Sequence, residues 1–144
     1  MFMSTVKAIP EGYRTVTPYL IVDKASEVIE FMKRAFGAQL VFQMANPDGS
    51  IGHSELRVGD SMIMLGSVRE KWKAMPAMIH LYVENCDAVF AKAVEAGAEV
   101  VMPIADQFYG DRSGGVKDVA GNYWWIATHV KDVSEEEIKR AKQQ

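Results

Sequence analysis

Two similar stretches decide the fold: AFGAQLVFQ at residues 35–43 and EAGAEVVMP at residues 95–103. At an offset of about 60 residues, Gly37 aligns with Gly97, and an apolar, strand-like segment follows each glycine. A second set of glycines matches at an offset of about 62, Gly52 and Gly59 against Gly114 and Gly121. This shared order and spacing predict that the chain is an internal duplication.

Each half shows the same series of hydrophobic periods, alternating for strands and helical for one segment. The first half predicts a strand at 16–22, a helix at 25–36, and strands at 40–44, 52–58 and 62–65. The second half predicts a strand at 78–83, a helix at 87–96, and strands at 99–102, 115–118 and 123–128. We therefore expect an α+β fold of two tandem βαβββ modules, forming a cupped mixed sheet with the helices on its outer face. The predicted organisation is a single domain, 1–144, with module one at about 13–68, module two at about 74–131 and a C-terminal helix at about 134–142.

Composition narrows the class of protein. The 144 residues are 49% hydrophobic and 24% charged, which is typical of a globular domain and argues against a membrane-spanning protein. A net charge of −3 gives no basic patch for nucleic acid. The segment Met1 to Lys7 does not have the pattern of a signal peptide, and Cys86 is the only cysteine. We expect a cytoplasmic protein that binds neither nucleic acid nor membrane.

Strand alternation predicts which side chains face away from the helices. This face would collect aromatic, sulfur and ionisable groups, namely Thr17, Tyr19, His53, Glu55, Arg57, Met78, His80 and Tyr82. Such a mixture is typical of a ligand pocket. The alternative is a plain solvated face of an antiparallel sheet, and the sequence leaves both interpretations open.

Other candidates lie near the end of the chain. Residues 103–114 are expected to form a long irregular loop, in which Arg112 would either clamp a ligand anion or pair with a neighbouring aspartate. Trp124 and Trp125 must point to opposite faces of their strand. We expect Trp125 in the cavity and Trp124 under a helix.

The segments TPYLIVD, GHSELRVGDSMIML and FYGDRSGGVKDVAGNYWWIATHV are similar to the glyoxalase/bleomycin resistance/dioxygenase (vicinal oxygen chelate) superfamily, in particular its PhnB-like branch. The resemblance covers about residues 13–131. One departure is the turn DVAGN, where Val119 stands in place of the family's usual proline. The resemblance implies two βαβββ modules, a small-molecule site and a homodimer.

In metal-using relatives, four cavity positions carry His, Gln or Glu ligands. They align here with Thr17, Ile63 or Met64, Met78 and Trp125, none of which suits a hard or borderline divalent ion. We therefore predict no metal and no other cofactor. A divalent ion held instead by His53, Glu55 and His80 is the alternative.

These observations support competing functions. The first is a metal-free small-molecule binding protein of the bleomycin-resistance type, with the ligand in the concave sheet cavity between Tyr19, Tyr82 and Trp125, and with Phe108 or Tyr109 stacking on it. The second is a lyase, isomerase or dioxygenase-like enzyme, in which Glu55 acts as acid or base with His53 or His80. The third is a structural or regulatory dimer with a vestigial cavity.

Overall fold

The computed structural model describes residues 5–142. Residues 1–4 of the segment that was compared with a signal peptide, Met1 to Lys7, lie outside the described residues. Module one contains β1 (Tyr19–Val22), α1 (Ala25–Phe36), β2 (Gln39–Ala45), β3 (Ile51–Val58) and β4 (Ser61–Ser67). Module two contains β5 (Met78–Tyr82), α2 (Cys86–Glu95), β6 (Glu99–Asp106), β7 (Asp111–Lys117) and β8 (Tyr123–His129). Helix α3 (Glu135–Lys142) follows. The predicted α+β fold of two βαβββ modules is confirmed.

Each module forms a four-stranded mixed sheet with the same topology. The strand orders are β1-β4-β3-β2 and β5-β8-β7-β6, and the first strand of each module runs parallel to the last. The remaining pairs are antiparallel. Since each parallel pair requires a crossover, the single helix of each module follows its first strand.

Local sequence explains where the two main helices begin and end. Gly37 ends α1 in the left-handed conformation, with φ 66°, and its N–H donates to the carbonyl of Lys33. The side chain of Asn85 caps α2 by accepting a hydrogen bond of 3.1 Å from the N–H of Ala88.

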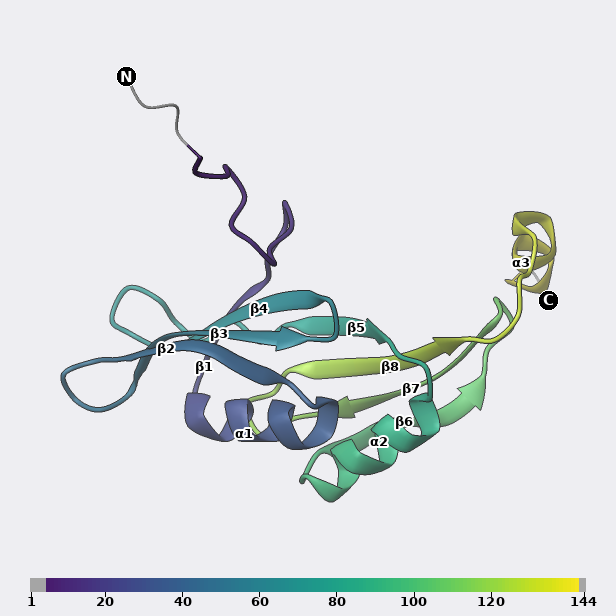
Figure 1. Ribbon diagram of the computed structural model, residues 1–144. Coiled ribbons are helices and arrows are strands. Elements are labelled where there is room, and N and C mark those ends of the chain that lie inside the picture. The colour runs from purple at the N-terminus through teal and green to yellow at the C-terminus, as the bar shows by residue number, and fades with distance from the viewer. Residues whose placement is uncertain (1–4, 143–144) are drawn as a thin grey trace.

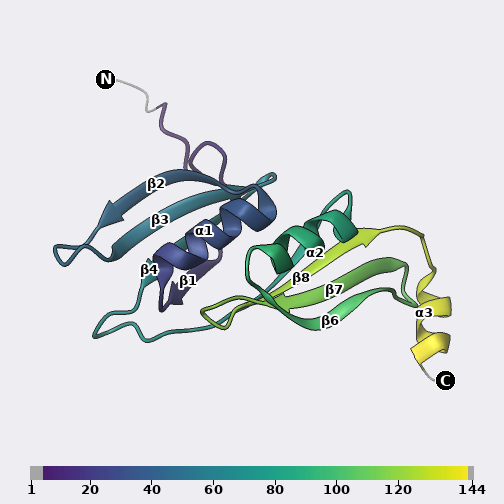
Figure 2. The ribbon, with the colours of Figure 1, turned by 90° about the horizontal axis from the view of Figure 1, so that it is seen from below.

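Helices α1 and α2 lie side by side on the same side of the two sheets (Figures 1 and 2). Their inward side chains form one core with the sheets, which includes Leu20, Met32, Leu56 and Ile126. The indole of Trp124, on β8, packs against Phe31 and Phe36 of α1, so this core joins the two modules. Within residues 5–142, no helix covers the opposite face of the sheets, which we call the open face (Figure 1).

Two predicted boundaries are wrong. Strand β1 begins at Tyr19 instead of residue 16, because Pro18 has no N–H to donate to a ladder and only its carbonyl pairs, with the N–H of Met64. Residues 103–114 are not a long loop but the hairpin of β6 and β7, with only residues 107–110 between the strands. Register shifts in β6, together with Pro103 on an edge strand, disrupt the alternation that would have revealed the strand.

The C-terminal helix extends from module two, and none of its described side chains is buried (Figure 1). Ser134 precedes it and accepts a hydrogen bond of 3.2 Å from the N–H of Glu137, as its capping-box spacing predicts. Among residues 5–142, no helix combines the length and apolar character needed to cross a bilayer.

Candidate functional site

The open face carries most of the predicted site residues. On β5, exposure alternates, and Met78, His80 and Tyr82 point away from the helices while Ile79 and Leu81 point toward them. Strand β3 likewise places His53, Glu55 and Arg57 on the open face and buries Ser54 and Leu56 beneath it. The faces therefore follow the predicted alternation.

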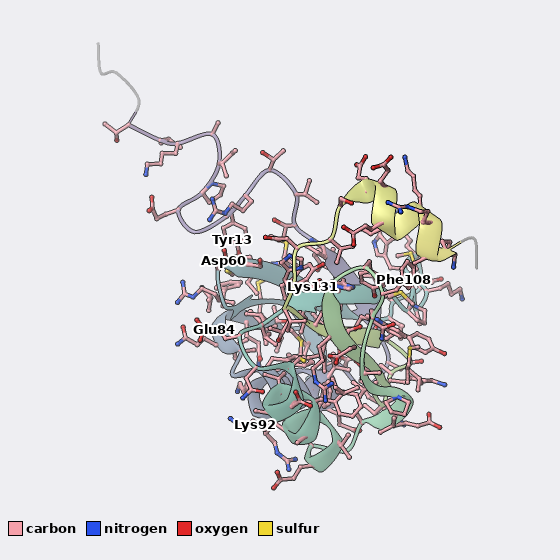
Figure 3. All side chains as sticks on the ribbon, turned by 90° about the vertical axis from the view of Figure 1, so that its right-hand side faces the viewer. Tyr13, Asp60, Glu84, Lys92, Phe108 and Lys131 are labelled. Carbon is pink, nitrogen blue, oxygen red and sulfur yellow. The ribbon has the colours of Figure 1, made fainter. Side chains whose placement is uncertain are left out.

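In module one, four side chains form a continuous hydrogen-bonded series across the open face. Tyr13, from the segment before β1, donates its hydroxyl proton to Glu55 Oε1. The other carboxylate oxygen of Glu55 lies 2.8 Å from His53 Nε2, and His53 Nδ1 lies 2.8 Å from the hydroxyl of Tyr19. Figure 3 labels Tyr13 in its N-terminal segment. We call the hydrogen-bonded series that begins at Tyr19 and ends at Glu55 the Tyr19–His53–Glu55 chain, and Tyr13 donates to its carboxylate end.

The direction of these hydrogen bonds follows from the carboxylate, which only accepts when it is ionised. In neutral His53, Nε2 therefore carries the proton and donates it to Glu55, which leaves the lone pair of Nδ1 to accept from the Tyr19 O–H. A proton that leaves Tyr19 would move to His53 Nδ1, and the resulting imidazolium would face the Glu55 carboxylate. This arrangement suits acid–base chemistry at the phenolic oxygen.

Module two also has a polar cluster, centred on the carboxylate of Asp111. One oxygen accepts from the Tyr82 hydroxyl at 2.7 Å, and the other lies 2.8 Å from His129 Nδ1. His129 Nε2 lies 2.7 Å from Asp132. Asp111 is buried while Tyr82 and His129 are exposed, so a buried carboxylate on β7 joins surface side chains from β5 and from the end of β8.

These contacts shift the three pKa values in the second cluster. Burial on its own raises the pKa of Asp111, but the hydrogen bonds from His129 and Tyr82 outweigh it, and the pKa lies below its ordinary value. The hydrogen bond to Asp132, followed by that to Asp111, raises the pKa of His129. The hydrogen bond to the Asp111 carboxylate raises the pKa of Tyr82. These shifts favour the protonated imidazole of His129, the ionised carboxylate of Asp111 and the protonated phenol of Tyr82.

Arg112 corrects one prediction. It lies on the helix side of β7, where its guanidinium donates to Asp87 of α2 at 2.9 and 3.0 Å and to Asp106 at 3.2 Å. These two carboxylates raise the pKa of Arg112, and the guanidinium lowers that of Asp87. Of the two interpretations of Arg112, the structure therefore agrees with pairing to aspartates. The guanidinium does not reach the open face, so it is not available to bind an anion there.

Phe108 and Tyr109 lie in the turn between β6 and β7, and Tyr109 is close enough to Tyr82 to contribute, after the Asp111 hydrogen bond, to the raised pKa of that phenol. Phe108 and Tyr109 stack edge to face at 5.3 Å, and Phe108 lies at the end of the molecule that carries α3 (Figure 3). The turn is joined to the chain after β8, since Gly110 accepts from the N–H groups of Val130 and Lys131. The pair therefore belongs to the far end of module two.

Trp124 and Trp125 take the opposite faces that alternation predicts. Trp124 is fully buried under α1, and its indole N–H donates to Asp118 at 2.8 Å. Trp125 lies on the open face, with its ring directly over Gly115. A methyl group on Gly115 would lie 2.3 Å from Trp125 Cζ3, so the absence of a side chain there makes room for the indole.

The remaining predicted residues are divided between two places. Arg57 is exposed and donates to Gln39 at 2.8 Å. A cavity of about 560 Å³ at the seam between the modules brings together Thr17, His80 and Tyr82. Its walls include residues of the segment 14–18 before β1, the β3–β4 turn and β5, and it does not include the Tyr19–His53–Glu55 chain.

The four positions that carry metal ligands in the metal-using relatives do not fit a metal here. Of the two alternatives on β4, Met64 lies on the open face, whereas Ile63 is buried in the core. Thr17, Met64, Met78 and Trp125 provide one neutral hydroxyl, two thioethers and an indole, which are poor ligands for hard or borderline ions.

The alternative metal set is not assembled either. His53 and Glu55 are hydrogen-bonded to each other, but His80 lies on β5 against Tyr82, with ring centroids 4.9 Å apart. Residues 5–142 contain no group of three His, Cys, Asp or Glu side chains placed to hold a metal ion. His53, Glu55 and His80, which the sequence offered only as the alternative metal set, therefore do not come together among the described residues.

Sequence reasoning missed several residues of the two clusters. Tyr13 lies outside any strand, so alternation did not place it. Asp111 falls in the segment that the sequence predicted to be a loop. A period-two pattern from Asp111 to Lys117 would have been the signal for β7, but glycines at 114 and 115 interrupt it.

Comparisons with known proteins agree with this architecture. The glyoxalase/bleomycin resistance protein/dioxygenase superfamily matches residues 14–126. An uncharacterized protein of Mycobacterium bovis is 36% identical over 137 residues, which cover 88% of this chain and 90% of that protein.

Solved structures show the same fold. TioX from Micromonospora sp. ML1 has a TM-score of 0.70 at 23% identity, covering 81% of this chain and 99% of TioX. Protein PA1353 from Pseudomonas aeruginosa has a TM-score of 0.69 at 21% identity, covering 82% of this chain and 99% of that one. The two structures share the fold of this chain, and the family match over residues 14–126 shows that the chain belongs to the glyoxalase/bleomycin resistance protein/dioxygenase superfamily.

Proposed function

We propose that this chain is a metal-free binding protein that holds a small organic molecule on its open face. The observation that carries the proposal is the set of large apolar and aromatic side chains that this face exposes on both modules. Met78 is 66% exposed and Tyr82 is 64% exposed, and Phe42, Met44 and Met102 lie on the same face. Clusters of this kind on a monomer mark interaction sites.

We further propose a homodimer in which the open face of one chain meets that of another. In the part of the chain that the structure describes, helices cover each sheet on one side only, so a lone chain leaves its ligand face as a wide surface (Figure 1). A second chain would turn that surface into an enclosed cavity. We also propose that the chain belongs to the PhnB-like branch, which the motif GHSELRVGDSMIML and the segment FYGDRSGG support. Its use of a single cysteine, Cys86, supports a cytoplasmic location.

The test uses the chain's methionines as reporters. Protein labelled with carbon-13 in the methionine methyl groups is titrated with a library of small organic acids, amines and aromatic compounds. We expect a binding compound to shift the signals of Met44, Met64 and Met78, while that of Met32, which is buried in the core, stays in place. A library in which no compound moves the open-face methyls would contradict the proposal.

Trp125 provides the matched variant. If its half-buried indole stacks on the ligand, Trp125→Ala should weaken binding by about 1–3 kcal/mol, as at binding hot spots. Equal affinity in the variant would remove Trp125 from the site.

A second function, acid–base catalysis, is favoured by the Tyr19–His53–Glu55 chain. The enzyme would use Tyr19 to take a proton from a carbon next to a carbonyl group and pass its own proton to His53. The test is exchange of that hydrogen for solvent deuterium in 2-oxo acids. Glu55→Gln should abolish exchange but leave binding within a few-fold, and undiminished exchange would remove Glu55 from the mechanism.

A further inference from the structure

We propose that the linker between the modules forms a subsite for a planar aromatic carboxylate. The subsite is a hollow of about 370 Å³ lined by Tyr19, Ile21, Arg69, Trp72 and Met75. A cavity of this size is within the range of small-molecule sites. The inference depends on the proposed binding function and gives it a ligand class.

Backbone hydrogen bonds hold the linker in place against module one. The N–H of Met75 donates to the carbonyl of Ile21 at 2.9 Å, which attaches the linker to the edge strand β1. Arg69 and Trp72 exchange two backbone hydrogen bonds of 2.9 and 3.1 Å, which close a tight turn. The hollow is therefore built from an anchored turn and a sheet edge.

The hollow is lined by large side chains that contact water extensively. Trp72 is 55% exposed, Met75 is 52% exposed, and Tyr19 is exposed beside them. The hydrogen bond to His53 fixes the orientation of the Tyr19 ring. Two aromatic rings and a thioether around one opening are suited to a flat apolar ligand, since stacking and sulfur–aromatic contacts both favour it.

Arg69 is the only charged residue in the lining. Its Nη2 donates to the carbonyl of Gly52 at 2.9 Å, which holds the guanidinium in place and leaves its other N–H groups for a ligand. Across residues 5–142, no carboxylate lies within ion-pair distance of Arg69. A single uncompensated guanidinium matches a monoanion with two oxygens, which a carboxylate supplies.

The experiment is titration calorimetry of the full chain with 2-naphthoate. Two analogues separate the parts of the ligand: 2-naphthalenemethanol keeps the ring without the charge, and cyclohexanecarboxylate keeps the charge without the aromatic ring. We expect 2-naphthoate to bind more tightly than either. Equal binding of 2-naphthalenemethanol would overturn the role of Arg69, and equal binding of cyclohexanecarboxylate would overturn that of the aromatic rings.

Three variants locate the site. Trp72→Ala and Arg69→Gln should each weaken 2-naphthoate binding about tenfold or more, because each removes a stacking or charge-assisted contact. Lys71→Gln removes a charge from the same turn without touching the lining, and should stay within about twofold. Equal weakening in Arg69→Gln and Lys71→Gln would indicate a diffuse charge effect, and undiminished binding in Trp72→Ala would show that the ligand does not stack there; either result would overturn the subsite.

The methionine signals separate this proposal from the broader one. Bound 2-naphthoate should shift the methyl of Met75 first. If other compounds bind to the open face but 2-naphthoate does not, or if it shifts Met44 and Met78 without Met75, the subsite is wrong while the binding function stands. If nothing in the library binds, both proposals fail.

Discussion

The two modules have the same topology, but they fill the same row of their open faces in opposite ways. In module one this row runs across β1, β4 and β3 through Tyr19, Met64 and Glu55. In module two the corresponding row runs across β5, β8 and β7 through His80, Trp125 and Gly115. A carboxylate in one module thus corresponds to a glycine in the other, and the indole of Trp125 fills the space above that glycine.

This difference also separates the two polar clusters by what they can do. In module one the histidine is central and leaves a polarised tyrosine hydroxyl on the surface. In module two the carboxylate of Asp111 is central and buried, and it holds Tyr82 and His129 at fixed positions. We infer that module one carries reactive polar groups, whereas module two provides an aromatic surface on a rigid base.

The largest expected effect comes from Asp111→Asn. The variant loses the buried charge that accepts from Tyr82 and pairs with His129, so we expect a loss of about 3 kcal/mol in the free energy of unfolding. Urea denaturation measures it. Asp106→Asn is the control, because this carboxylate makes an exposed ion pair with Arg112, and it should change stability by less than about 0.5 kcal/mol. A similar small loss for Asp111→Asn would mean that the second cluster is not a structural base.

Gly115→Ala tests the packing of Trp125. The added methyl would occupy the place of the indole, so the ring must move, and we expect a destabilisation of about 2 kcal/mol. The near-ultraviolet circular dichroism of the tryptophans should change with it. Gly49→Ala is a control in an exposed turn, where strain alone acts and no side chain meets the new methyl. An unchanged tryptophan spectrum in Gly115→Ala would contradict the proposed close packing.

The sequence predicted which residues share the open face, because side chains two positions apart on a strand point to the same face. Met78, His80 and Tyr82 illustrate this, since the apolar residues between them, Ile79 and Leu81, point toward the helices. The partners of Arg112 could not be predicted in the same way. Its contact with Asp87 joins residues 25 apart in the sequence, and it depends on how α2 packs on the sheet. Tyr13 was beyond prediction for a similar reason, since it belongs to a segment without regular structure.

The titration of His129 should distinguish the clusters by pH. Because its pKa is raised in the folded chain, its pairing stabilises the fold fully below the ordinary histidine pKa of about 6.5, and this contribution disappears as pH rises through the folded pKa. Asp111, with a lowered pKa, contributes above the ordinary aspartate pKa, and its contribution disappears as pH falls through the folded value. Proton NMR of the three histidines should show that Asp132→Asn lowers the pKa of His129. An unchanged pKa would show that Asp132 does not hold the imidazolium.

The smallest effect on stability is expected from Glu55→Gln. This variant tests which ring nitrogen of His53 carries the proton. Glutamine keeps an oxygen that accepts from His53 Nε2–H, so the free energy of unfolding should fall by less than about 1 kcal/mol. Nitrogen-15 shifts of neutral His53 should show the proton on Nε2 in the original chain and a mixture of tautomers in the variant, because the neutral amide enforces donation less strongly than a carboxylate. If the proton is already distributed over both nitrogens in the original chain, Glu55 does not orient His53. Tyr19 would then lack the directed acceptor that makes module one the reactive half.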